Sequence, residues 1–136
     1  MSLFGAMPIA NSGIDVSQTW IDAVAGNIAN ANDAVSTSQS AYETQYVVAQ
    51  PVASTQPGGA GQGVVASQVL LGGAAGQLAY DPGNPLADAQ GMVRYPAVDL
   101  GQQMVDLVMA QTGYQANVAV VNQAKAAYQS ALTLGS

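Results

Sequence analysis

The sequence predicts a mainly α-helical protein with a small β insert, in which two long terminal helices form an antiparallel, coiled-coil-like pair. Apolar residues recur at helical spacing near both ends, from about residue 10 to 31 and from about 98 to 133. The section between them is rich in Val, Tyr, Gly and Pro, which is typical of short strands and turns. At 136 residues, the chain has room for one domain or for two long helices with a smaller insert.

The predicted N-terminal helix carries a regular apolar stripe. Two interleaved rows of apolar residues each recur every seven positions and are broken only at Ser17. The rows consist of Ala10, Ile14, Ile21, Val24, Ile28 and Ala31. With Trp20, Val16 and Ala23 included, the apolar arc covers about half of the helix circumference, which is more than one partner helix can bury.

The predicted C-terminal helix has apolar residues on more than one side. Its main rows, interrupted at Gln111 and Lys125, are Met104, Leu107, Tyr114, Val118, Val121, Tyr128 and Leu132. A second group on a different side is Val105, Met109, Ala116, Val120 and Ala127. A chain of this size can hardly bury both helices on itself, so we expect neighbouring subunits to cover much of this surface.

The middle section, residues 34–96, is expected to be β-rich. Short segments at 41–52, 61–71 and 91–96 have strand composition. Gly and Pro predict a flexible loop near 54–63 and a fixed irregular crossing over 80–88, and GGAAGQ at 72–77 is expected to be a flexible bend.

Charge excludes several classes of partner. The net charge is −6, and only Arg94 and Lys125 are basic, so we expect each to pair with an acidic residue. Phosphate backbones and anionic membranes require clustered Lys and Arg, and no segment reaches the ~20 apolar residues of a membrane span. We therefore expect no nucleic acid partner and no direct membrane insertion. The first residues also lack the positive segment of a secretory signal.

The sequence contains few of the residue types that catalysis usually requires. His and Cys are absent, so catalytic triads and thiolate sites are excluded. Asp81 and Asp88 could form a carboxylate pair or, with Asn84, surround Ca²⁺, but their spacing fits no EF-hand, and capping of their own turn is the simpler interpretation. We expect no enzyme activity, no cofactor and no metal.

The amides of GNIANAN, residues 26–32, allow two interpretations. In one, they end the helix, with Asn32 closing it in the left-handed conformation. In the other, Asn27 and Asn30 lie beside the apolar arc, where an amide can donate and accept hydrogen bonds across a helix interface and fix its register.

The segment that contains these amides also resembles a helix of a known protein family. IANSGIDVSQTWIDAVAGNIANAN resembles the N-terminal helix of the flagellar rod, hook and hook-associated axial proteins. GYQANVAVVNQAK at 113–125 is similar to the C-terminal helix of that family, and YDPGNPLADAQGMVRYPAVDL resembles its proximal-rod member. The resemblance covers about residues 1–33 and 80–136. Residues 51–79 match no segment of that family, and Asp33 stands where the family often has Thr.

The resemblance implies a structural subunit of the bacterial flagellar basal body that helps to transmit motor torque. Its partners would be copies of itself and other rod proteins in a helical assembly, and the flagellar export apparatus would secrete it without a cleaved signal. Residues 1–33 and 97–136 would form the inner coiled-coil layer of a rod that crosses the periplasm. The expected subunit-packing residues are Ile14, Trp20, Ile21, Val24, Asn27, Ile28, Asn30, Leu107, Tyr114, Gln115, Asn117, Val118, Val121, Tyr128 and Leu132, with Ala29 and Ala116 from the same motifs.

Two alternatives remain open. The chain could be another rod or hook-type axial subunit, although its small size and the segment at 80–91 favour the proximal rod. It could also be a small secreted helical-hairpin dimer. Such proteins often carry a Trp-x-Gly turn between their helices, whereas Trp20 is followed by Ile21 and Asp22 inside the predicted helix.

Overall fold

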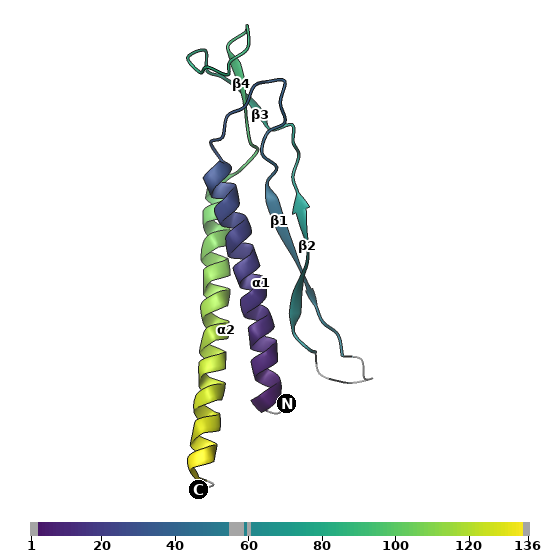
Figure 1. Ribbon diagram of the computed structural model, residues 1–136, viewed down its shortest axis with the longest axis vertical. Helices are drawn as coiled ribbons and strands as arrows, with labels where there is room; N and C mark the ends of the chain where they lie inside the picture. Colours follow the sequence, from purple (N-terminus) through teal and green to yellow (C-terminus); the bar gives the residue numbers. More distant parts are fainter. Residues whose placement is uncertain (1–2, 55–58, 60, 135–136) are drawn as a thin grey trace. The chain divides into compact units, whose positions relative to one another are not determined.

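The computed structural model describes residues 3–54, 59 and 61–134, with side chains from residue 5 onward. Its elements, in chain order, are α1 (Leu3–Asn30), β1 (Gln45–Pro51), β2 (Val64–Leu71), β3 (Gln77–Tyr80), β4 (Met92–Tyr95) and α2 (Leu100–Leu134) (Figure 1). The prediction of two long terminal helices around a small β insert is confirmed. The expected flexible loop at 54–63 falls partly on residues 55–58 and 60, which lie outside the described residues.

The helix boundaries differ from the predicted ones mainly at the N-terminus. Helix α1 begins at Leu3, well before the apolar repeat starts, and includes Pro8. Gly5 and Pro8 weaken the helical signal of this first part, because neither residue is a good helix former. Helix α2 has nearly the predicted length.

Asp99 caps the start of α2, so its substitution tests a local contribution to stability. Its Oδ1 accepts the backbone N–H of Gln102 at 3.0 Å. We expect Asp99→Ala to lower the free energy of unfolding by about 1 kcal/mol, because the first-turn N–H loses its partner. Urea unfolding followed by circular dichroism measures the loss. Asp106→Ala removes the same charge inside the helix, and an equal loss in both variants would contradict the capping role.

The strands form two separate two-stranded sheets, β1–β2 and β3–β4. In the second sheet the strands are antiparallel, with Gln77 opposite Tyr95 and Tyr80 opposite Met92. Strand β3 was not predicted, because its four residues include only two large apolar side chains and follow a Gly-rich stretch.

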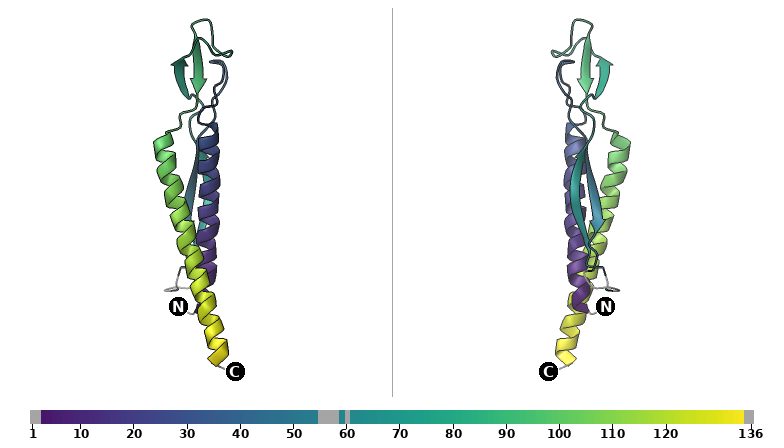
Figure 2. Two further views of the ribbon diagram at one scale, coloured as in Figure 1. Left: turned by 90° about the vertical axis from the view of Figure 1, so that its left-hand side faces the viewer. Right: turned by 90° about the vertical axis from the view of Figure 1, so that its right-hand side faces the viewer.

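The chain divides into two compact units. The first comprises Met1–Ile21, Val47–Gln68 and Val108–Ser136. Within it, the first part of α1 and the last part of α2 lie side by side in opposite directions, and α2 extends past the start of α1 (Figure 2). The second unit comprises Asp22–Tyr46 and Val69–Leu107 and contains the β3–β4 sheet.

The buried residues are mostly small. Fully or nearly fully buried apolar side chains are Ala10, Ala23, Val24, Ala31, Ala41, Val93, Ala110 and Ala124, and buried polar ones are Ser17, Asn27, Thr44 and Gln103. Small side chains bury little apolar area each, so this core provides limited hydrophobic stabilisation. Among the described helices, none is long and apolar enough to cross a membrane.

Candidate subunit-packing surfaces

The side chain of Asn27 forms four hydrogen bonds within the second unit. Its side chain is 0% exposed. Its Nδ2 donates to the backbone oxygen of Gln45 at 2.9 Å and to Oε1 of Gln103 at 2.8 Å. Its Oδ1 accepts the Tyr42 hydroxyl at 3.1 Å and the Gln45 backbone N–H at 2.8 Å. Both donors and both acceptor positions of the amide are therefore used within the chain.

The predicted bridging role of the amides is realised at Asn27, which connects α1 to α2 and to the first residue of β1. The structure thus gives Asn27 a role inside the chain and leaves it no hydrogen-bonding group for a neighbouring subunit. Asn30 donates only to the Gly26 oxygen of its own helix, at 2.8 Å. The interpretation of Asn32 as a left-handed cap is wrong, because no described residue other than glycine has a positive φ.

In the first unit, the two helices approach closely at a reciprocal pair of glycines. A Cβ added at Gly13 would lie 2.6 Å from Nδ2 of Asn117, and one added at Gly113 would lie 3.3 Å from Oγ of Ser17. Each polar side chain also bonds the carbonyl oxygen four residues earlier, Ser17 to Gly13 and Asn117 to Gly113. Each helix therefore offers a glycine where the other places a short polar side chain.

This contact explains why the apolar rows predicted only part of the packing. The most buried positions of α2 in the described chain are Gln103, Ala110 and Ala124, with a spacing that includes Asn117. On α1, Ser17 is buried although it appeared to break the apolar stripe. Hydrophobic periodicity could not find Ser17 and Asn117, because a close helix approach selects for small size and not for apolarity. Gln103 is a separate case, because it is buried where it accepts a hydrogen bond from Asn27. The missed signal was the matching Gly-x-x-x-Ser and Gly-x-x-x-Asn spacing.

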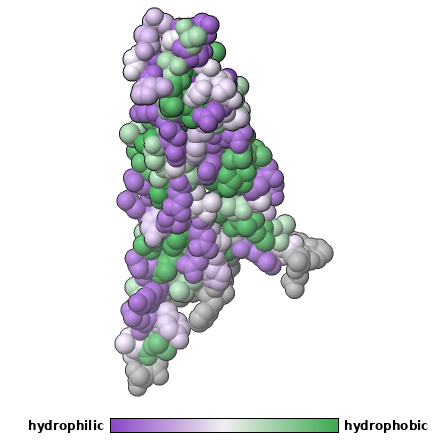
Figure 3. Space-filling model, turned by 45° about the horizontal axis from the view of Figure 1, so that its top comes forward, coloured by the Kyte–Doolittle hydropathy of each residue, from purple (hydrophilic) through white to green (hydrophobic). Residues whose placement is uncertain are grey.

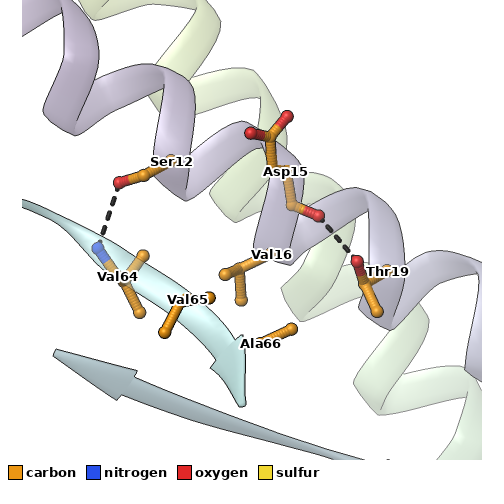
Figure 4. Close-up of a pocket in the computed structure, with 7 residues that line it drawn as sticks. All are labelled: Ser12, Asp15, Val16, Thr19, Val64, Val65 and Ala66. Carbon is orange, nitrogen blue, oxygen red and sulfur yellow. Dashed lines mark hydrogen bonds between the residues drawn. The ribbon is translucent and has the colours of Figure 1, made fainter. Parts of the chain in front are cut away.

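The β1–β2 hairpin is attached to α1 through Ser12. Oγ of Ser12 accepts the backbone N–H of Val64 at 3.0 Å (Figure 4). It also donates to the Ile9 oxygen at 2.7 Å. Gly63, with φ of 114°, lets the hairpin backbone come this close, since a Cβ there would lie 2.2 Å from Oγ of Ser12. A shallow hollow of about 240 Å³ lies beside this contact, and of the described residues that line it only Asp15 is charged.

Asp88 organises the loop between β3 and β4. Its carboxylate accepts the backbone N–H groups of Met92 at 2.9 Å and Gln90 at 3.0 Å, and the Thr37 hydroxyl at 3.0 Å. Asp81 and Asn84 bond each other and the turn they belong to, which confirms the capping interpretation for this pair.

The hydrogen bond from the Met92 N–H, helped by the Thr37 hydroxyl and the Gln90 N–H and opposed by desolvation, lowers the pKa of Asp88 from its ordinary value. A lowered folded pKa means that the stabilising contribution is complete above the ordinary Asp value of about 4 and is lost as the pH falls through the lowered value. We expect the loop at 81–91 to loosen below about pH 4. Amide exchange of Met92 against pH measures this loosening, and Asp88→Asn should remove most of the pH dependence. A pH profile unchanged by that substitution would contradict the assignment.

The expected ion pairing of Arg94 is not observed among the described residues. Its guanidinium donates to the backbone oxygens of Ala75 and Thr37. Together with the bond from the Ala41 N–H to the Ala74 oxygen, these contacts hold the segment at 72–77, which sequence composition suggested to be a flexible bend.

The predicted packing residues occupy different environments. Val24 is buried along with Asn27, while half-buried positions are Ile14, Trp20, Ile21, Ile28, Asn30, Leu107, Tyr114, Asn117, Val118 and Val121. The exposed ones are Gln115, Tyr128 and Leu132, together with Ala29 and Ala116. The half-buried side chains are partly covered by the chain itself. The exposed residues therefore have the most side-chain surface that a neighbouring subunit could cover.

Helix α2 also exposes apolar side chains that lie outside its main predicted rows. Val105 is 53% exposed, Met109 55% and Val120 44%. These three residues belong to the second group identified from the sequence, which is therefore exposed in the single chain. Figure 3 shows apolar side chains at the surface interspersed with polar ones. On soluble proteins, large contiguous patches of exposed apolar side chains mark interaction sites.

Residues 89–134, which include all of α2, match the family described as flagellar basal body rod FlgEFG protein C-terminal. The match covers the helix that carries the exposed apolar residues.

Relatives match over nearly the whole chain. The flagellar basal-body rod protein FlgC of Yersinia enterocolitica is 39% identical over 135 residues, with 99% of each chain covered. The protein of the same name from Salmonella typhimurium is 38% identical over 135 residues, again covering 99% of each. The Bacillus subtilis FlgC is 30% identical over an alignment of 149 residues and 99% of each chain. These alignments include residues 34–79, which the sequence motifs alone did not relate to the family.

Proposed function

Because the chain belongs to the FlgC family of flagellar basal-body rod proteins, we propose that it is a subunit of the proximal rod and transmits motor torque. It is a structural protein and not an enzyme. Its partners are other rod components. We further propose that the flagellar export apparatus secretes it without a cleaved signal, as its resemblance to axial proteins implies.

The exposed apolar side of α2 is the observation that supports an assembling subunit. A core of mainly small residues leaves Val105, Met109 and Val120 in contact with solvent. Their burial against neighbouring helices would gain about 25 cal/mol per Å² of apolar area. We propose that α1 and α2 pair as a coiled coil in the rod and that this side of α2 contacts the next subunit. The exposed candidates Tyr128 and Leu132 belong to the main rows, on a different side of α2, and we propose that they contact another neighbouring subunit.

Met109→Asp tests this proposal. An exposed Asp should leave the free subunit folded, whereas desolvating its charge in a helix interface is costly. We expect unchanged circular dichroism of the purified protein and an at least tenfold lower amount in isolated basal bodies, which corresponds to roughly 1.4 kcal/mol or more. Gln39→Asp adds the same charge at an exposed loop position and serves as the control. Normal incorporation of Met109→Asp would refute the proposed contact.

A further inference from the structure

The outer edge of β3 has unpaired backbone groups. The N–H of Asp81 donates to the Gly91 oxygen, so residues 77, 79 and 81 direct their backbone groups toward β4. Because the direction alternates along an antiparallel strand, Leu78 and Tyr80 direct theirs away from β4. In the part of the chain that the structure describes, these two N–H and two C=O groups form no hydrogen bond.

The opposite edge of the same sheet shows how such an edge is satisfied. There Arg94 exchanges two backbone hydrogen bonds with Val35, at 2.9 and 2.8 Å. One edge of the sheet is thus covered by the chain itself, while the β3 edge is left open.

Of the features that normally prevent strands from associating, the β3 edge has only its short length of four residues. It contains no Lys, no Pro and no inward-pointing charge. Leu78 is 57% exposed and Tyr80 is 72% exposed, and both side chains lie on the same face, since they are two residues apart.

Tyr80 is held in place although it is largely exposed. A Cβ added at Gly91 would lie 2.8 Å from Cε2 of the Tyr80 ring, which shows that the ring rests on the glycine backbone. Gly91 has φ of 75°, a conformation that favours glycine. A tyrosine side chain has only two rotatable bonds, so it loses little entropy on binding and makes an effective anchor.

Resting on the proposed function, we propose that the β3 edge binds an extended segment of a different rod component, which adds to the sheet as a third strand. The segment would place apolar residues beside Leu78 and Tyr80 and a Lys or Arg beside Asp81, which directly follows β3. Backbone hydrogen bonds would supply affinity, and the alternating side chains would supply specificity.

Charge argues against a second copy of this chain as the occupant. The chain has eight acidic and two basic residues. Arg94 is used by the oxygens of Ala75 and Thr37, and Lys125 lies in α2. A copy therefore has no basic strand to place beside Asp81, whereas a different protein can have one.

Residue-resolved amide exchange on purified protein and on isolated basal bodies tests this proposal. We expect the amides of Leu78 and Tyr80 to exchange at least about 100-fold more slowly in the basal body, while Gln77 and Ala79 are protected in both samples. Leu78→Lys should abolish the added protection and leave Gln77 and Ala79 protected, which shows that the sheet is intact. Equal exchange of Leu78 and Tyr80 in both samples would overturn the proposal.

Cross-linking identifies the occupant. The chain has no cysteine, so Leu78→Cys introduces a unique attachment point for a photoactivatable cross-linker. A cross-linked peptide from another polypeptide, with apolar residues alternating and a Lys or Arg nearby, is expected. A cross-link to this chain itself would overturn the choice of occupant. Absence of the chain from basal bodies would instead refute the proposed function, and this inference would fall with it.

Discussion

Asn27→Ala is expected to lower the free energy of unfolding by about 3 to 4 kcal/mol. The substitution removes all four hydrogen bonds of a side chain that is 0% exposed. The backbone N–H and oxygen of Gln45, the Tyr42 hydroxyl and Oε1 of Gln103 would lose a partner. Each buried polar group left without a partner costs about 1 to 3 kcal/mol, reduced where water can enter.

The same motif supplies matched controls for Asn27. Asn30→Ala removes a single bond to the Gly26 oxygen within one helix and should cost less than about 1 kcal/mol. Asn32 is exposed, and Asn32→Ala should have almost no effect. Urea unfolding of the three variants, followed by circular dichroism, gives the order. Comparable losses at Asn27 and Asn32 would contradict the internal role of Asn27.

Gly76→Ala is expected to destabilise the second unit by about 3 kcal/mol or more. Gly76 has φ of 55°, and a Cβ there would lie 2.3 Å from the Tyr95 backbone oxygen and 2.7 Å from Cβ of Ala41. The left-handed conformation costs a non-glycine residue about 1 to 2 kcal/mol. Because the main obstacle is a backbone atom, the overlap cannot be relieved by rotating a side chain.

Gly73 in the same turn is the control for Gly76. Apart from Gly73 itself and its two chain neighbours, no heavy atom of the described chain lies within 4 Å of the position its Cβ would occupy. Gly73→Ala should therefore be neutral, or stabilising by a few tenths of a kcal/mol through the unfolded state. Thermal unfolding with amide exchange at 72–77 compares the two variants. A Gly76→Ala protein as stable as Gly73→Ala would show that the turn is not packed as described.

The two helices were predictable from sequence because their apolar residues repeat over many turns. Strands 45–51, 64–71 and 92–95 also fall within the predicted segments, since Val and Tyr between turn residues form a recognisable local pattern. The four-residue β3 was missed because its pairing with β4 depends on a register between distant residues, such as Gln77 and Tyr95, and not on local composition.

The packing residues were harder to predict than the elements. Asn27 was predicted, together with Asn30, to form hydrogen bonds across a helix interface. Its partners Tyr42, Gln45 and Gln103 lie 15 to 76 residues away, and no local sequence pattern identifies them. Gly13 and Gly113 have no side chain to create a hydrophobic signal. Their role follows only from the close approach of another helix, which appears once the chain is folded.

Mass-spectrometric quantification of the chain in isolated basal bodies tests the central claim most directly. The chain would replace the resident FlgC in a flagellated bacterium, and basal bodies would be purified away from cytoplasm and membranes. A rod subunit should be found there in amounts comparable to those of the other rod proteins. Its absence from intact basal bodies, with the folded protein recovered only in soluble fractions, would contradict the assignment as a rod subunit.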